Sequence, residues 1–317
     1  MVNPALSICI PTYNRKEILK NLLHSIQSLS ETTIEVVIVD DGSDDGTADY
    51  CRELKPDFNL ILVQQENQGR ATALYKSIQN ATGDFIIIMD SDDRFLDSAI
   101  DHILESLLKY ENILSSPKVC GLVFGCVDEN KKKIGDDFKV EGINNFLRYR
   151  ADEGVLGDKK EVVKSSFLKS VLYKPFDSEP RMPTSILWAR LARKYDVVAV
   201  NSPVAIKEYL KGGMTGKSRE LRVKSIRSTL LYYEECLSDF FTHYKSVGYG
   251  IRIGANYIRY SIYYRSLDMR RLSMLTLPQA AVVIVSAPLG ILLFFSDLLY
   301  WRKSLRYFSG VDNKNYP

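Results

Sequence analysis

The sequence predicts an α/β fold in which a mostly parallel sheet carries helices on both faces. Three observations in the first 125 residues support this prediction. Short runs rich in Val and Ile alternate with longer amphipathic stretches, the runs are apolar on both faces, and each run ends in a polar turn. Alternating strands and helices form βαβ units, and the strands of a parallel sheet that is covered on both sides are apolar throughout.

Five runs have the length and composition of buried strands, and they occupy residues 6–11, 35–41, 59–65, 85–90 and 119–125. Residues 197–203 are a further candidate strand. Apolar residues recur at helical spacing in three intervening stretches, 18–26, 71–78 and 99–108. Because open α/β sheets bind ligands at the carboxyl ends of their strands, we expect the chemistry to lie in the polar turns that follow these strands.

Charge is divided unevenly along the chain. Residues 1–210 carry a net charge of −6 and residues 211–317 a net charge of +9. The acidic part argues against nucleic acid as a ligand, whereas the basic part suits an anionic membrane surface. The five cysteines form no CxxC pair and lie mostly in apolar runs, which is typical of reduced thiols in a cytosolic compartment.

The C-terminal part is predicted to be helical and to associate with a membrane. Residues 272–296 contain no charged side chain, and 25 residues are enough to span a bilayer. Trp301 and the basic residues after it resemble an interface anchor, but Pro288 interrupts the stretch. An embedded or re-entrant helix pair, a single span and a helix packed on protein all remain open. We expect two domains, 1–215 and 216–317.

The first two polar turns could cap helices, and the second could also bind a nucleoside. In "PTYNR", Pro11 ends the first strand, and Thr12 and Asn14 could cap the next helix. In "VDDGSDDGT", Asp41 follows the second strand, where a carboxylate can accept hydrogen bonds from a base N–H or a ribose hydroxyl. The alternative for this turn is an acidic cap on the helix that begins at Thr47.

The other two turns suit phosphates and a metal ion. In "NQGRATALYKSI", Arg70 stands at a helix start, where a cation is unfavourable unless an anionic ligand binds there; a surface arginine is the alternative. In "DSDD", Asp90 and Asp92 are spaced i and i+2 on a turn and could face one divalent cation. Carboxylate oxygens favour Mg²⁺ or Mn²⁺, although acidic triplets are also common on surfaces.

In order and spacing, these four turns resemble glycosyltransferase family 2, the inverting enzymes of GT-A fold. The resemblance covers residues 5–215 and is strongest in the first 100. It implies a Rossmann-like GT-A sheet, a nucleotide-diphospho-sugar donor, usually UDP-linked, and a Mn²⁺ or Mg²⁺ cofactor. It places Asp41 at the base and Asp92, with Asp93, at the metal. The full set that it implies for the nucleotide sugar is Pro11, Thr12, Tyr13, Arg15, Asp41, Arg70, Asp90 and Ser91.

This chain lacks the acidic pair that supplies the general base in the family. The family has an acidic pair a few residues before a helical run that here reads "WARLA", and Thr184 and Ser185 stand at that place. We expect Glu179 to be the base, with Asp158 in "GDK" as the alternative. A base elsewhere, lost activity and a phosphate acceptor remain open, because an anionic phosphate oxygen needs no deprotonation.

The Gly-rich stretch "YLKGGMTGKS" resembles a mobile segment of the family. Lys211 could close over the diphosphate, with Gly212 and Gly213 as hinges; a solvated linker is the alternative.

The expected function is a metal-dependent hexosyltransferase at the cytoplasmic face of the cell membrane. Its acceptor would be lipid-linked or a glycan, in cell-surface polysaccharide synthesis. A polyprenyl-phosphate glycosyltransferase and a non-catalytic nucleotide-sugar-binding membrane scaffold are the alternatives. The Tyr-rich helical tail could also form a homo-oligomer interface.

Overall fold

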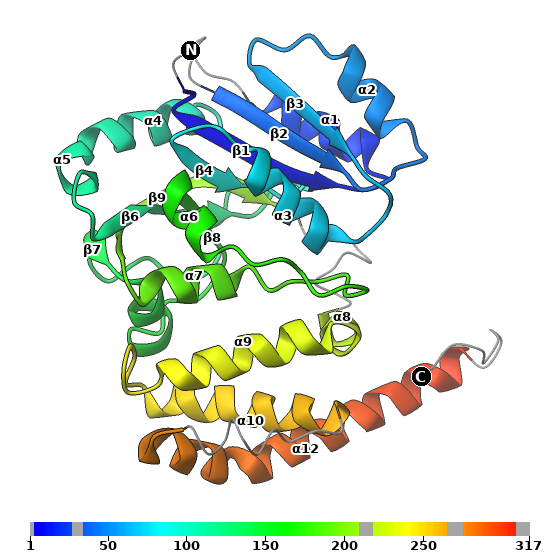
Figure 1. Cartoon of the computed structure of the whole chain (residues 1–317), viewed down its shortest axis with the longest axis vertical. Helices are drawn as coiled ribbons and strands as arrows, with labels where there is room; N and C mark the ends of the chain where they lie inside the picture. The colour runs from blue at the N-terminus through cyan, green and yellow to red at the C-terminus, as the bar shows by residue number, and fades with distance from the viewer. Residues whose placement is uncertain (1–2, 27–33, 209–217, 265–274, 309–317) are drawn as a thin grey trace. The chain divides into compact units, whose positions relative to one another are not determined.

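The computed structural model describes residues 3–26, 34–208, 218–264 and 275–308 (Figure 1). The chain divides into two compact units, Met1–Ser228 and Thr229–Pro317. The domain boundary expected at residue 215 falls outside the described residues and stays a prediction. Each unit is therefore described by itself.

Nine strands form one sheet in the described part of the first unit, in the order β3-β2-β1-β4-β8-β6-β9-β5, with β7 paired to β9. The first four positions hold β1 (Leu6–Thr12), β2 (Ile34–Asp40), β3 (Asn59–Gln64) and β4 (Phe85–Ile88), which pair in parallel. These strands confirm the runs expected from the sequence to within two residues. Because they are parallel, their carboxyl ends meet at one edge of the sheet, where Thr12 pairs with Asp40.

The second half of the sheet is mixed. β8 (Lys159–Lys164) runs antiparallel to both β4 and β6 (Val119–Val127), and β6 pairs in parallel with β9 (Asp196–Lys207). β5 (Asp93–Phe95) and β7 (Gly142–Asn144) both pair antiparallel with β9. The α/β class is confirmed: the first four strands are parallel, and the second half combines the parallel β6–β9 pair with antiparallel pairs. The β5–β9 pairing matters for the site, because it brings the acidic turn beside the end of β9.

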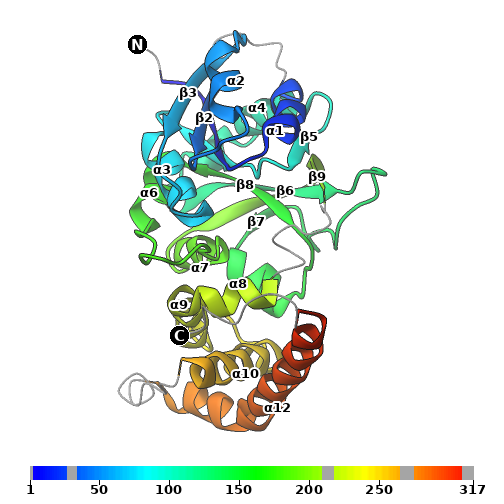
Figure 2. The same cartoon turned by 90° about the vertical axis from the view of Figure 1, so that its right-hand side faces the viewer.

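Helices cover both faces of the sheet, as expected. α1 (Lys16–His24), α2 (Thr47–Glu53) and α4 (Ala99–Lys109) lie on one face, and α3 (Arg70–Asn80) and α6 (Ser165–Val171) on the other (Figure 2). Alternate residues of β1 face the first group, and a shared core buries them with the apolar stripes of α1 and α4; its fully buried members include Leu6, Ile8, Ile10, Leu19, Leu22, Ile100 and Ile103. Fully burying each such side chain contributes about 1.5–3 kcal/mol, so these contacts hold the strand ends that carry the polar turns.

The remaining helices of the first unit are short. They are α5 (Glu111–Leu114), the π-helix η1 (Arg148–Asp152), α7 (Ser185–Ala192) and α8 (Ser218–Lys224). α9 (Ile226–Asp239) begins at the end of the first unit and continues into the second.

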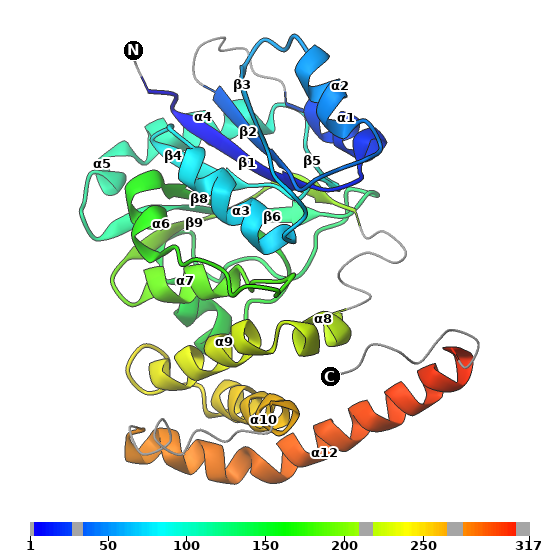
Figure 3. The same ribbon diagram turned by 45° about the vertical axis from the view of Figure 1, so that its right-hand side comes forward.

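The second unit is helical in its described part. α10 (Val247–Tyr263) and α12 (Leu277–Phe308) lie side by side (Figure 3). Gly290 allows the two helices to approach closely because it has no Cβ; a Cβ at this position would lie 2.6 Å from the Ala255 carbonyl oxygen. Arg259 and Asp297 form a buried ion pair between the helices, with the Arg259 Nε 2.6 Å from an Asp297 carboxylate oxygen.

The outward side of α12 is apolar. Judged by length and composition only, its stretch Leu277–Trp301 could cross a membrane. The helix continues through Pro288, so the interruption expected there does not break it. Its exposed large side chains are Leu277, Ile284, Val285, Leu289, Ile291, Leu292, Phe295, Leu298, Leu299 and Tyr300. The start of the expected apolar segment, residues 272–274, lies outside the described residues.

Candidate active site

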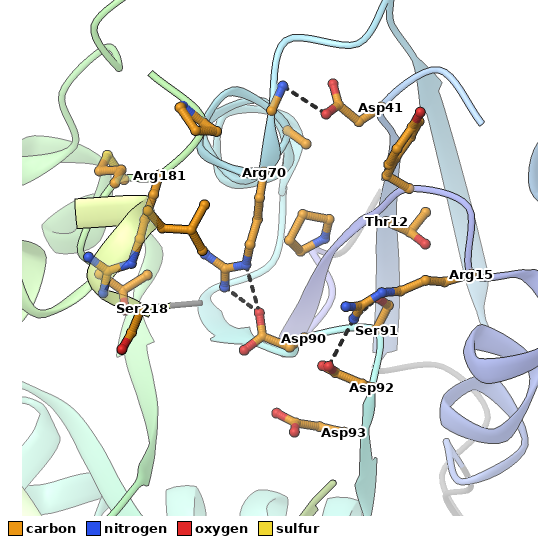
Figure 4. Close-up of a pocket in the computed structure, with 18 of the residues that line it drawn as sticks. Thr12, Arg15, Asp41, Arg70, Asp90, Ser91, Asp92, Asp93, Arg181 and Ser218 are labelled. Atoms are coloured by element: carbon orange, nitrogen blue, oxygen red, sulfur yellow. Dashed lines mark hydrogen bonds and ion pairs between the residues drawn. The ribbon is translucent and has the colours of Figure 1, made fainter. Parts of the chain in front are cut away.

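A cleft of about 760 Å³ lies in the first unit, where β1, β2 and β4 end (Figure 4). It brings together all four turns that the sequence singled out. The expected site residues that line it are Pro11, Thr12, Tyr13, Arg15, Asp41, Arg70, Asp90, Ser91, Asp92, Asp93 and Asp158. The expected lid residues, Lys211, Gly212 and Gly213, lie outside the described residues.

The turn after β1 presents two groups to the cleft. Thr12 is buried, and its hydroxyl has no hydrogen-bond partner among the described residues. Tyr13 is 45% exposed, so its ring is a surface on which a base could stack. Thr12 and Asn14 do not cap α1 as expected, because the backbone N–H of Lys16 donates to Asp45 instead, at 3.0 Å. A ligand at this edge could therefore satisfy Thr12.

Asp41 holds the neighbouring loop in place. Its Oδ1 accepts hydrogen bonds from the Gln65 side chain at 2.6 Å and the Gln68 backbone N–H at 2.8 Å, and its Oδ2 accepts from the Gly69 N–H at 2.8 Å. A carboxylate has about four acceptor positions. These contacts occupy three of them, which is compatible with one further hydrogen bond from a base.

Gly69 links this loop to the opposite wall of the cleft. Its φ of +89° lies in the region that favours glycine, and a Cβ there would lie 2.8 Å from the Cα of Pro180. Pro180 and Arg181 belong to the segment that lines the far side of the cleft, opposite Arg15 in Figure 4. The close contact at Gly69 thus fixes the width of the cleft at this point.

Arg70 and Asp90 form an ion pair across the floor of the cleft. The Arg70 Nε lies 2.9 Å from Asp90 Oδ1, and a second guanidinium nitrogen contacts the same oxygen. Burial alone would raise the pKa of the Asp90 carboxyl, but Arg70, Lys207 and Lys160 hold it well below its usual range. The ion pair with Asp90 therefore explains why a cation, Arg70, stands at the start of α3. The Arg70 side chain also lines the cleft.

Asp92 pairs with Arg15, whose Nη1 lies 2.9 Å from Asp92 Oδ2. The same nitrogen is 3.3 Å from the Ser91 hydroxyl. Both charged side chains are partly exposed, at 25% for Arg15 and 18% for Asp92. Asp92 is thus a carboxylate at the cleft surface with one cationic neighbour.

Asp93 differs from Asp92 in its surroundings. It is 1% exposed, and its Oδ2 lies 2.7 Å from the Lys160 Nζ and 2.9 Å from the Lys207 Nζ. Two ammonium groups on one carboxylate oxygen leave little reason for a metal ion to bind there, since the like charges would repel it. This arrangement argues against the expected role of Asp93 as a metal ligand.

Glu179 lies away from the cleft surface. It is 5% exposed, and its carboxylate accepts hydrogen bonds from the backbone N–H groups of Arg227 at 2.8 Å and Ser228 at 2.9 Å, so it caps the start of α9. It is not among the residues that line the cleft. A carboxylate held in this way is poorly placed to deprotonate an acceptor, which argues against Glu179 as the base. Asp158, the alternative, does line the cleft, as does Thr184.

The sequence interpretation missed part of the cleft wall. The missed residues that contribute polar or charged groups are Arg181, Lys207, Glu208, Ser218 and Arg222. Lys207 could have been found if the candidate strand 197–203 had been extended, because β9 continues to Lys207. Glu208 follows Lys207 directly. Ser218 and Arg222 belong to the part predicted only to be helical, and Arg181 lies in a segment without a periodic pattern, so the sequence gave no signal that these three line a site.

The sequence of the first unit matches a known family. Residues 7–158 match the family described as Glycosyl transferase family 2. The chain carries a glycosyltransferase family 2 domain. This confirms the resemblance and the enzyme class expected from the four turns.

Relatives of this family 2 domain act on varied substrates. The chain is 24% identical over 292 residues to the GalNAc(5)-diNAcBac-PP-undecaprenol β-1,3-glucosyltransferase of Campylobacter jejuni, covering 84% of this chain and 89% of that one. It is 31% identical over 202 residues to the poly-β-1,6-N-acetyl-D-glucosamine synthase of Staphylococcus epidermidis, covering 58% of this chain and 49% of the relative. It spans only 16% of the glycosyltransferase GlyA of Streptococcus pneumoniae, to which it is 28% identical over 112 residues.

Solved structures share the GT-A fold of this family 2 domain. S. aureus TarS 1–349 in complex with UDP-GlcNAc matches with a TM-score of 0.54 and 17% identity, covering 89% of each chain. The mannosyltransferase PcManGT from Pyrobaculum calidifontis, in complex with GDP-Man and Mn²⁺, matches with a TM-score of 0.55 and 20% identity, covering 92% of this chain and 81% of that one. At these identities the likeness concerns the fold.

Replacing Gly69 by Ala should weaken nucleotide binding more than it disturbs the rest of the unit. The new Cβ would meet the Pro180 backbone and strain a left-handed residue whose N–H bonds Asp41. We expect at least a tenfold loss in affinity for a nucleoside diphosphate, measured by calorimetry, and a loss of stability of about 1–3 kcal/mol. Gly154→Ala is the matched control, because Gly154 also has a positive φ but has nothing within 4 Å of its added Cβ. Equal effects of the two substitutions on affinity would contradict the assignment.

Proposed function

We propose that this chain transfers a hexose, with inversion, from a nucleotide-diphospho-sugar to a lipid-linked or glycan acceptor. The observation that carries the proposal is the cleft in which Thr12, Tyr13 and Asp41 lie at one end and Asp92 lies at the floor. The first three suit a nucleoside, and Asp92 could hold a divalent cation that balances the charge of a diphosphate. A UDP-linked donor is the preferred version, because of the family resemblance.

Asp92 is the residue that fits a divalent cation. Mg²⁺ is commonly bound by one or two carboxylates together with substrate phosphates, so a single partly exposed carboxylate is sufficient. Asp92 meets this condition, whereas Asp93 is enclosed by two lysines. When bound, Mn²⁺ or Mg²⁺ would neutralise negative charge that develops on the departing diphosphate. Arg15 would hold the Asp92 carboxylate in position.

The chain's own residues would divide the remaining work. Thr12, Tyr13 and Asp41 would bind and orient the nucleoside, while Arg70 would hold Asp90 near the ribose. Asp158 is our candidate for the base that takes the proton from the acceptor hydroxyl. Proton transfer of this kind contributes about 10²- to 10⁴-fold to a rate.

A lipid-linked acceptor would bring the reaction to a membrane. The Campylobacter jejuni relative is named for an undecaprenol-linked glycan, and the Staphylococcus epidermidis relative for a polysaccharide. In this chain, the exposed apolar side of α12 and the net charge of +9 over residues 211–317 support attachment to an anionic bilayer. We therefore propose a site of action at the cytoplasmic face of the cell membrane, in cell-surface polysaccharide synthesis.

Asp92→Ala should remove most of the metal-stimulated transfer. We expect kcat/KM to fall about 100-fold or more, the usual effect of losing one group that stabilises developing charge. The assay uses labelled UDP-sugars with Mn²⁺ titrated against EDTA. Asp57→Ala, which removes an exposed carboxylate in the α2–β3 loop, is the control and should stay active. Full activity of Asp92→Ala in EDTA would overturn the metal assignment, and donor binding without turnover on any acceptor would favour a non-catalytic scaffold.

A phosphate acceptor is a second candidate, because Thr184 stands where the family has an acid, and the basic residues Arg181 and Arg222 line the same cleft. The prediction that separates the two candidates concerns polyprenyl phosphate. If it is the acceptor, it yields a lipid monophosphosugar, and Asp158→Asn retains activity because no hydroxyl is deprotonated. If a glycan hydroxyl is the acceptor, polyprenyl phosphate gives no product and Asp158→Asn loses about 100-fold or more. Thin-layer separation of labelled lipids distinguishes the products.

The membrane proposal predicts that charges on the exposed side of α12 release the chain from lipid. Leu292→Glu with Phe295→Glu should abolish co-flotation with vesicles that contain phosphatidylglycerol, because burying each charge is costly. Leu108→Glu is the matched control, since Leu108 is an exposed apolar residue of α4 in the first unit. Unchanged flotation of the double variant would contradict attachment through α12.

A further inference from the structure

We propose that Lys207 binds the diphosphate of the donor and that Asp93 is its positioning residue. This proposal rests on the proposed function, because it assigns a further residue to the same donor site. It also gives the third carboxylate of the acidic turn a purpose other than metal binding. Three features of the cleft carry it: the pairing of β5 with β9, the other cationic partners of the three carboxylates, and the exposure of the Lys207 side chain.

The sheet fixes Lys207 beside the acidic turn. β5 begins at Asp93, and its antiparallel pairing with β9 sets Asp93 directly opposite Lys207. The Lys207 Nζ lies 2.9 Å from Asp93 Oδ2 and 3.5 Å from Asp90 Oδ2. Backbone pairing therefore determines where this ammonium group lies, and the carboxylates on either side limit its movement.

Each carboxylate of the acidic turn has a cationic partner other than Lys207. Asp90 is paired with Arg70, Asp92 with Arg15 and Asp93 with Lys160. Each of the three carboxylates thus has a cationic partner before Lys207 is considered.

Lys207 is a fourth cation beside these three carboxylates, and Asp158 also lines the cleft and acts on it electrostatically. Because each carboxylate of the acidic turn keeps another cationic partner, Lys207 could donate to a phosphate oxygen without leaving any of the three unpaired.

The two lysines that contact Asp93 have different roles because their side chains differ in solvent exposure. The Lys160 side chain is 6% exposed and also contacts the Ile88 carbonyl oxygen at 3.3 Å, so it neutralises Asp93 from inside the sheet. The Lys207 side chain is 17% exposed and lines the cleft, whereas Lys160 does not. Lys207 is therefore the lysine that an anionic ligand can reach, and a charge-assisted hydrogen bond to a phosphate oxygen requires only a small shift of its Nζ.

The experiment measures UDP binding to the full chain by calorimetry, once in EDTA and once with Mn²⁺. Lys207→Met should weaken UDP binding in EDTA by about 10- to 100-fold, the loss of one hydrogen bond to a charged group. It should leave uridine binding unchanged, because uridine has no phosphate. Lys207→Arg should retain affinity within about threefold, since it keeps the charge and donors. Lys132→Met removes an exposed lysine of the hairpin after β6 and is the control.

Metal titration separates the positioning role of Asp93 from metal binding. Asp93→Asn should weaken UDP binding in EDTA as Lys207→Met does, and should leave the Mn²⁺ concentration for half-maximal stimulation unchanged. Asp92→Asn should raise that concentration. Because Asp93 is buried between two lysines, its variant could fail to fold, and the Lys207 variants then decide the proposal alone.

The outcomes distinguish this proposal from the one on which it rests. If the wild-type chain binds UDP but Lys207→Met binds it within twofold as tightly, or loses uridine affinity equally, Lys207 is structural and only this inference fails. If Asp93→Asn folds and raises the Mn²⁺ requirement, Asp93 is a metal ligand and the positioning role is overturned. If the wild-type chain binds neither UDP nor GDP, dTDP or CDP, the proposed donor site itself is wrong.

Discussion

The cleft depends on the neutralisation of an acidic turn by cations from other elements. Asp90, Asp92 and Asp93 lie within four residues at the end of a buried strand, and their mutual repulsion would be costly without partners. The partners come from the turn after β1, the start of α3, the start of β8 and the end of β9. These ion pairs connect both halves of the sheet to one floor, so the turn is both the centre of the site and a junction of the fold.

The sequence predicted the parallel half of the sheet well, because strand length, apolar faces and turn chemistry are local properties. The antiparallel β8 and the pairing of β5 with β9 were not predicted, since register between distant strands leaves no local pattern. The same limit explains the site. Asp41, Arg70 and Asp92 were placed at the cleft from their positions after strands, whereas the partners of Asp93 lie 67 and 114 residues away.

Glu179, the expected base, has a suitable functional group but does not line the cleft. Glu179 is the acid close to the position where the family has its base, and sequence distance alone favoured it. Its carboxylate instead accepts the N–H groups of Arg227 and Ser228, which open a helix 48 residues later. A carboxylate that accepts the first N–H groups of a helix satisfies donors that have no partner inside the helix, so Glu179 meets a structural need that only the folded chain reveals. Asp158, the alternative predicted from the run "GDK", does line the cleft.

In α12, as in the cleft, a buried carboxylate is neutralised by a cation from another element. Asp297 directly follows the uncharged stretch 272–296 in the sequence. In the structure it faces α10 and pairs with Arg259, so the charge is satisfied inside the helix pair. A buried charge that keeps its partner can lie within an apolar segment at modest cost, whereas the same charge facing lipid could not. The outward side of α12 thus stays uncharged past Asp297, as far as Tyr300, so the surface available to a bilayer extends beyond the point where the uncharged stretch of sequence ends.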